Sequence, residues 1–195
     1  MLLIAAVTLS AGGIGGKGCT RSKSDEASSV RAMGLNEVAV YEACIREASV
    51  DRVIAVVASS SIPEEKFPDL KRAQTFEIEG VSDATIQDFK RKGEEHRRLD
   101  YAFKDLEGVV VLSKDEARSF LTGESKWSGL AEEFQGASEI WRFSPIGFGA
   151  DERQALVLIE RYPSPRSGII YLAFMEWEGV EGWVERKRQI LLIGG

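Results

Sequence analysis

The stretch that decides the fold is ALVLIERYPSPRSGIIYLAFMEW, residues 155–177. It contains two apolar runs, ALVLI at 155–159 and IIYLAFM at 169–175, whose β-branched and aromatic content predicts two strands. The prolines and serines at 163–167 predict the turn between them. Because neither run alternates apolar with polar residues, we expect both faces of these strands to be buried, in the middle of a sheet.

Two more strands are predicted on either side of this pair, at 138–148 and 183–193. Turn residues at 149–152 and 178–182 connect them to the central strands. Four strands with short links predict an antiparallel meander over about 138–193. The last strand carries four consecutive charged residues at 185–188, which suits an edge strand because charges there discourage unwanted pairing.

The chain before this meander is predicted to be mostly helical. Its helices are expected at 36–48, 83–97, 114–122 and from Ser125 to Phe134, with buried strands at 52–58 and 108–112. Ser113 and Glu116 have the spacing of a capping box at the start of one helix. The sequence therefore predicts one α+β domain over residues 35–195, with helices packed on one face of a sheet.

The first residues have the pattern of an export signal. The apolar run LLIAAVTLSA at 2–11 is too short to span a bilayer as a helix and matches the core of a secretory signal. Cys19 follows small residues and precedes a polar stretch, as at the end of a bacterial lipoprotein signal. We therefore expect a signal at 1–19, lipidation of Cys19 and a flexible linker at 20–34. Without lipidation, cleavage near residues 11–13 would release a soluble protein.

Two other interpretations of this segment stay open. Gly13, Gly15 and Gly18 spell the G-x-G-x-x-G of a dinucleotide site, and 11–17 comes close to a phosphate-binding loop. Both motifs need a following helix whose N-terminus faces the phosphates, and residues 19–33 lack the apolar periodicity to pack one. The apolar run could also be a buried strand of the fold. Export remains the favoured interpretation.

Composition limits the function classes. The 195 residues are 44% hydrophobic and 29% charged, as in a soluble globular domain. With 25 basic against 31 acidic residues, the net charge of −6 gives no surplus to neutralise phosphates, so we expect no nucleic-acid partner. Two cysteines and one histidine leave little for a disulfide framework, a metal centre or a catalytic triad. We expect neither a metal nor a cofactor.

The chemistry-bearing side chains divide into an aromatic set and an acidic set. Most aromatic residues of the strands should be core, and the candidate binding face consists of Trp141, Tyr171, Trp177 and Trp183. The candidate acids of an enzyme are Glu139, Glu160 and Glu176. The remaining candidates have ordinary structural interpretations. We expect Cys44 to be a buried thiol, His96 a packed or half-exposed imidazole, and the serines at 59–61 loop hydroxyls.

Several stretches together carry a family resemblance. They are VVVLS at 109–113, the helix from Trp127 to Phe134, FSPIGFGADERQALVLIE at 143–160, and Gly182 with Trp183 before the last strand. On these features the chain from Val109 to its C-terminus resembles a group of uncharacterised bacterial exported proteins and lipoproteins. The resemblance implies a place in the cell envelope and transfers no activity and no functional residue.

The expected function is that of an exported cell-envelope protein, periplasmic or anchored through Cys19, that acts without catalysis. It would bind a protein or a small ligand, and would touch the membrane only through the lipid. The alternatives are a small extracytoplasmic enzyme that uses carboxylates in a cavity between sheet and helices, and an acidic immunity-type inhibitor of a toxin.

Overall fold

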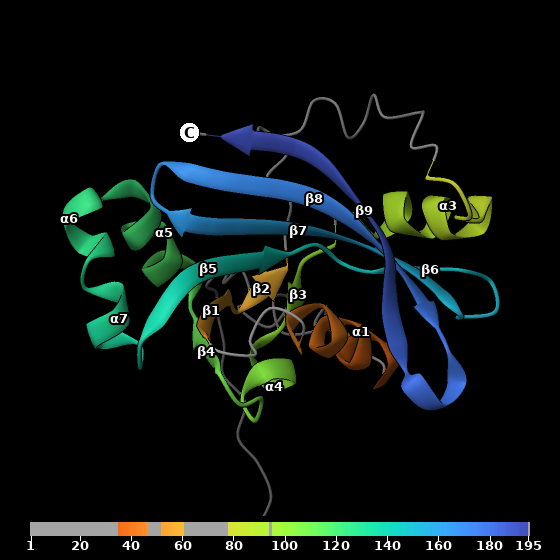
Figure 1. Ribbon diagram of the computed structural model, residues 1–195, viewed down its shortest axis with the longest axis horizontal. Helices are drawn as coiled ribbons and strands as arrows, with labels where there is room; N and C mark the ends of the chain where they lie inside the picture. The colour runs from red at the N-terminus through yellow and green to blue at the C-terminus, as the bar shows by residue number, and fades with distance from the viewer. Residues whose placement is uncertain (1–34, 47–51, 61–77, 94, 195) are drawn as a thin grey trace, which may run out of the picture.

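The computed structural model describes residues 35–46, 52–60, 78–93 and 95–194, which form an α+β domain, as predicted (Figure 1). The predicted signal and linker, Cys19 and Ser61 lie outside the described residues. Within the described part, none of the helices is long and apolar enough to cross a membrane.

The sheet is mixed. Over the described residues its strand order is β4-β1-β5-β7-β8-β9, with β6 paired to β7. The strands are β1 (Val53–Val57), β4 (Val109–Leu112), β5 (Ala137–Phe143), β6 (Gly147–Phe148), β7 (Gln154–Ser164), β8 (Ser167–Trp177) and β9 (Trp183–Gly194). β1 runs parallel to both β4 and β5, whereas each pair from β5 to β9 along this order is antiparallel. β5 is therefore the seam between a parallel half and an antiparallel half.

Short helices surround this sheet (Figure 1). They are α1 (Leu35–Arg46), α3 (Asp83–Lys92), α4 (Asp100–Phe103), α5 (Lys114–Thr122), α6 (Glu124–Trp127) and α7 (Leu130–Glu133), with a 3₁₀ turn η2 (Gly179–Glu181). The predicted capping box is confirmed, because the Ser113 hydroxyl accepts from the Glu116 N–H and the Glu116 carboxylate accepts from the Ser113 N–H. A separate small ribbon pairs β2 (Ser59–Ser60) with β3 (Arg97–Arg98).

The expectation that helices pack on one face of the sheet is wrong. α1 and α4 cover the face that carries Val56 and Val157. α5 and α7 cover the opposite side of the parallel half, and α3 packs on Leu158 in the antiparallel half. The physical reason lies in the decisive stretch itself, since strands that are apolar on both sides need a cover on both sides.

Three predicted elements are shorter than expected. The helix predicted over 83–97 ends at Lys92, because Arg97 enters β3 and its guanidinium pairs with the buried carboxylate of Glu37. The helix predicted from Ser125 divides into α6 and α7 around Gly129, a poor helix former. The strand predicted over 138–148 is interrupted before β6, next to Pro145, which has no N–H to donate.

Candidate functional site

An open cleft of about 800 Å³ lies at one end of the antiparallel half. Its walls are the start of α3, the turn before β7, the end of β8 and one residue of β9. The polar and aromatic residues that line it are Ser82, Asp151, Arg153, Gln154, Glu176, Trp177, Glu178 and Arg186. Trp177 and Glu176 are the two sequence candidates that meet here.

Trp177 gives this cleft an aromatic surface. Its side chain is 39% exposed. The indole packs edge-to-face on the indole of Trp183, with ring centroids 5.9 Å apart, and Trp183 in turn contacts the Phe148 ring at 5.8 Å. Gly182, at φ +81°, lies under the Trp177 ring, where a Cβ would come within 3.8 Å of it. One side of the Trp177 indole is therefore fixed by packing, and the other part is open to a ligand. The aromatic surface is thus formed before any ligand binds.

The acids of the cleft are paired. The Arg186 Nε lies 3.2 Å from a Glu176 carboxylate oxygen, and the Arg186 guanidinium also pairs with Glu178. Gln154 donates a long hydrogen bond of 3.4 Å to the other Glu176 oxygen. These ion pairs and this hydrogen bond fix the positions of the donors and acceptors, which suits binding of a ligand through several hydrogen bonds.

Gln154 also fixes the wall of the cleft. Its Oε1 accepts from the Ser82 N–H at 3.0 Å and the Thr85 hydroxyl at 3.3 Å, and its Nε2 donates to the Gly80 carbonyl at 2.9 Å. This one side chain thus ties β7 to the start of α3. The backbone of Arg153 is held as well, because its carbonyl accepts from the Trp177 N–H at 2.9 Å. Among the described residues the Arg153 guanidinium has no ion pair, which leaves its five donors for a ligand.

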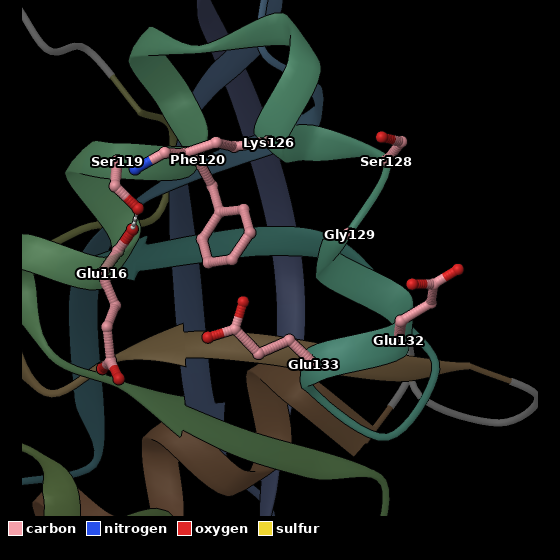
Figure 2. Close-up of a pocket in the computed structure, with 8 residues that line it drawn as sticks. All are labelled: Glu116, Ser119, Phe120, Lys126, Ser128, Gly129, Glu132 and Glu133. Atoms are coloured by element: carbon pink, nitrogen blue, oxygen red, sulfur yellow. Dashed lines mark hydrogen bonds between the residues drawn. The ribbon is translucent and has the colours of Figure 1, made fainter.

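A second, smaller hollow lies between α5, α6 and α7, with a volume of about 420 Å³ (Figure 2). Figure 2 shows Glu116 and Ser119 on one side of it and Glu132 and Glu133 on the other, with the Phe120 ring between them. Glu116 belongs to the helix cap, since hydrogen bonds from the Ser113 hydroxyl and backbone lower the pKa of this carboxyl. This hollow is walled by exposed carboxylates, and we take the Trp177 cleft as the candidate site.

The other two candidate acids lie on opposite faces of the sheet. Glu139 shares the α1 face with Trp141, whereas Glu160 shares the opposite face with Tyr162. A pair of acids on opposite faces cannot act on one substrate. Glu160 and Glu176 share a face, but Glu160 pairs in register with Ile170, six residues before Glu176 along β8, which separates them by roughly 20 Å. The proposed enzyme alternative therefore has no pair of converging acids among these three.

Each of these two buried carboxylates has its own partners. Glu139 accepts from the Trp141 indole N–H at 2.9 Å, from Arg161 at 2.8 Å and from Arg52 at 3.0 Å. Burial alone would raise the pKa of Glu139, but the hydrogen bonds from Trp141 and Arg161 outweigh it and lower the pKa. Glu160 accepts from the Tyr162 hydroxyl at 2.6 Å, and burial together with this carboxylate raises the pKa of Tyr162.

Of the four aromatic candidates, only Trp177 reaches the surface. Trp141 and Tyr171 are 1% exposed and Trp183 is 7% exposed, all within the core between the sheet and α1. Trp177 differs from them because it ends its strand, where the covering elements stop. Sequence analysis did not select Arg153, Gln154 or Arg186. The signal that points to them is the pair of predicted turns at 149–152 and 178–182, which a meander brings to the same end of the sheet.

Two of the remaining candidates have structural roles. Cys44 is buried, as predicted, with its Sγ 3.9 Å from the Met175 Sδ. His96 is exposed and follows α3 instead of lying within it, so the expectation of a packed or half-exposed imidazole is wrong. The buried Ser60 hydroxyl accepts from the Arg97 N–H at 3.2 Å. In the part of the chain that is described, no group of three or more His, Cys, Asp or Glu side chains is placed to hold a metal ion.

Comparison of the chain with protein-family models, with curated proteins and with solved structures found no match. The resemblance to bacterial exported proteins thus stays a prediction from the sequence motifs, and the geometry of the cleft is the basis for inferring a function.

Proposed function

We propose that this chain is an exported, non-enzymatic protein of the bacterial cell envelope that binds a ligand in the Trp177 cleft. The observation that carries the proposal is the open indole of Trp177, backed by Trp183 and surrounded by held polar groups. A preformed aromatic surface with a few fixed hydrogen-bonding groups is typical of small-molecule sites.

The chemistry of the lining narrows the ligand class. The open part of the indole suits a flat, weakly polar face, and the planar guanidinium of Arg153 suits a neighbouring pair of oxygen atoms. The Glu176–Arg186–Glu178 network supplies further acceptors and donors at the other side. A sugar ring has one apolar face and a rim of hydroxyl or amide groups, so a saccharide fits this arrangement.

The binding test uses the β-linked trimer of N-acetylglucosamine as a probe, followed by titration calorimetry. We expect saturable binding by the unmodified chain and at least a tenfold loss of affinity in Trp177→Ala. Val180→Ala is the matched control, because Val180 is fully exposed on the adjoining turn and does not line the cleft. Equal affinity in the unmodified chain and Trp177→Ala, or no binding at all, would count against a saccharide site here.

The proposed location has a separate test. The apolar run at 2–11 and Cys19 support export and lipidation. Intact mass of the protein from the membrane fraction of a bacterial host should show processing and a diacylglyceryl-sized increase that Cys19→Ala abolishes. An unprocessed protein in the cytosolic fraction would contradict export. The immunity-type alternative rests on net charge alone and remains a prediction.

A further inference from the structure

One edge of the sheet carries no charge. β4 reads VVVL, and its first three side chains are half-buried. A groove of about 510 Å³ runs along this edge, between α4 on one side and the end of α7 on the other. Its lining includes Asp100, Lys104, Glu133 and the three valines of 109–111. Among the described residues, β1 is the only strand that pairs with β4.

The backbone of β4 offers hydrogen bonds to this groove. The Gly108 carbonyl accepts from the Ile54 N–H at 2.8 Å, and the Leu112 carbonyl accepts from the Ala58 N–H at 2.7 Å. Because alternate residues of a parallel strand face its neighbour, Val111 directs both its N–H and its C=O away from β1. Such outward groups are open to water or to another chain, and they form a template for another strand.

We propose that this edge pairs with the same edge of a second copy of the chain, as antiparallel β4 strands related by a two-fold axis at Val111. An outward residue with one donor and one acceptor is complementary to itself, so Val111 of each copy would exchange two hydrogen bonds with Val111 of the other. The two sheets would then continue into one, with the α1 faces on the same side.

The charges beside the groove match this symmetry on the α4 side. α4 begins at the carboxyl end of β1, where the Leu99 N–H donates to the Ala58 carbonyl, and the chain after α4 returns to the start of β4 through Leu106. Asp100 and Lys104 therefore flank opposite ends of the groove. Within one chain Asp100 pairs with Arg98, and the Lys104 Nζ lies 3.7 Å from an Asp105 carboxylate oxygen. The two-fold axis reverses one copy relative to the other, and so brings Lys104 toward the partner's Asp100 and adds an attraction between the copies to these pairs.

The opposite side of the groove has the same property. Glu133 lies at the end of α7, close to the start of the parallel strands, whereas Lys114 begins α5 directly after the carboxyl end of β4. Neither side chain has an ion pair among the described residues. Antiparallel pairing brings Glu133 toward the partner's Lys114, so this side of the groove also presents opposite charges to a second copy. The charges thus favour a second copy as the occupant of the groove, and the exchange of two hydrogen bonds at Val111 sets the antiparallel arrangement.

Sedimentation velocity of the full chain over a concentration series tests this proposal. A four-residue edge is a small interface, so we expect a reversible dimer with a dissociation constant in roughly the micromolar range. Val111→Pro removes the outward N–H and should leave the protein monomeric over the series. Circular dichroism checks that this variant is folded, and if it is not, the charge variants decide.

Charge exchange separates this interface from any other. Glu133→Lys should weaken the dimer about tenfold, and Glu133→Lys combined with Lys114→Glu should restore the original dissociation constant to within about twofold. Glu132→Lys is the matched control, because Glu132 neighbours Glu133 but does not line the groove. The proposal is overturned if the unmodified chain is monomeric throughout, in which case the edge is free for an unrelated partner strand. It is equally overturned if the exchanged pair fails to restore a weakened dimer, or if all variants dimerise alike.

Discussion

β4 and β9 are the two edges of one sheet, and they are protected in different ways. β9 is twelve residues long and carries consecutive charges at 185–188, of which Arg188 is held by Glu185 and lies over the Tyr171 ring. β4 has four residues and no charge. Charged side chains guard a long edge, whereas a short edge offers few hydrogen bonds. The antiparallel half thus ends in an edge that charges protect, whereas the parallel half ends in a short uncharged edge, which is the edge that we propose for the dimer.

The two halves also differ in what holds them together. The parallel half depends on helices, since β1 and β4 are short strands packed between α1 and α5, with β1 mostly buried and β4 half-buried. The antiparallel half consists of long strands and has α3 packed on the face opposite α1. β5 joins the halves, and Glu139 on β5 binds Arg52, just before β1, and Arg161 on β7. Substitutions at these points measure how far the halves depend on each other.

The largest effect is expected where α3 meets the antiparallel half. A Cβ at Gly147 would lie 2.3 Å from the Phe89 backbone nitrogen, so Gly147→Ala must push α3 away from β6. We expect a loss of about 3 kcal/mol in the free energy of unfolding, measured in urea. The control is Gly93→Ala, where a Cβ would meet its neighbours at an ordinary 3.5 Å and φ is −57°. A normal stability of Gly147→Ala would show that α3 is not held closely.

The next effect concerns the seam. Glu139→Gln removes the charge that two arginines share and leaves the half-buried Arg161 without its carboxylate. We expect a loss of about 2–3 kcal/mol in the free energy of unfolding. Glu107→Gln, at an exposed position outside the strands, should change it by less than about 0.5 kcal/mol. If the two variants are equally stable, the halves are joined by backbone pairing alone.

The same residue predicts a pH dependence. Because the folded state lowers the pKa of Glu139, its contribution to stability is present above the unfolded pKa of about 4.3 and is lost as the pH falls through the lower folded pKa. The pKa of Asp88 is lowered as well: burial would raise it, but hydrogen bonds from Lys92 and the Phe148 N–H outweigh burial. The free energy of unfolding should therefore fall between about pH 5 and 3, and less steeply in Glu139→Gln. Parallel curves for the two proteins would contradict the assignment.

A smaller effect is expected at the end of β4. Ser113→Ala removes the hydroxyl that caps α5, which should lower the free energy of unfolding by about 1 kcal/mol. Ser119→Ala on the same helix only removes a bond to the Glu116 carbonyl and should be close to neutral. A full-sized loss in Ser119→Ala would mean that the stability of α5 does not depend on its cap.

Local signals in the sequence predicted much of this fold. The capping box at Ser113 and Glu116, the buried strand at 155–159 and the charged edge at 185–188 each depend on neighbouring residues, and each is found in the structure. Contacts between distant segments were not predictable in the same way. Arg97 leaves its expected helix because Glu37, sixty residues earlier, binds it in the interior.

The candidate site was predictable only in part for the same reason. Trp177 and Glu176 could be selected from their strand, but Gln154 becomes important only when β7 and α3 meet. Glu139 and Glu160 were selected from the sequence as possible partners, but the structure separates them. Their placement on opposite faces follows from strand pairing and twist that the sequence pattern does not specify. The position of a residue within its strand was thus predictable from the sequence, whereas the contacts between strands and helices were not.

The smallest effect is expected at the charged edge itself. Arg188→Ala removes a guanidinium that lies 4.3 Å from the Tyr171 ring centroid and pairs with Glu185 at 2.8 Å, but this side chain is about one third exposed. We expect a loss of only about 0.5–1 kcal/mol in the free energy of unfolding. The control is Lys187→Ala, which should lose less because the Lys187 side chain lies over no aromatic ring among the described residues. The edge charges would then act mainly by keeping β9 from pairing with another chain. Light scattering of concentrated samples measures this association. A variant with Arg186, Lys187 and Arg188 all replaced by Thr should associate more readily than Arg188→Ala alone. If it stays as soluble as the unmodified chain, the contrast between the two edges does not depend on charge.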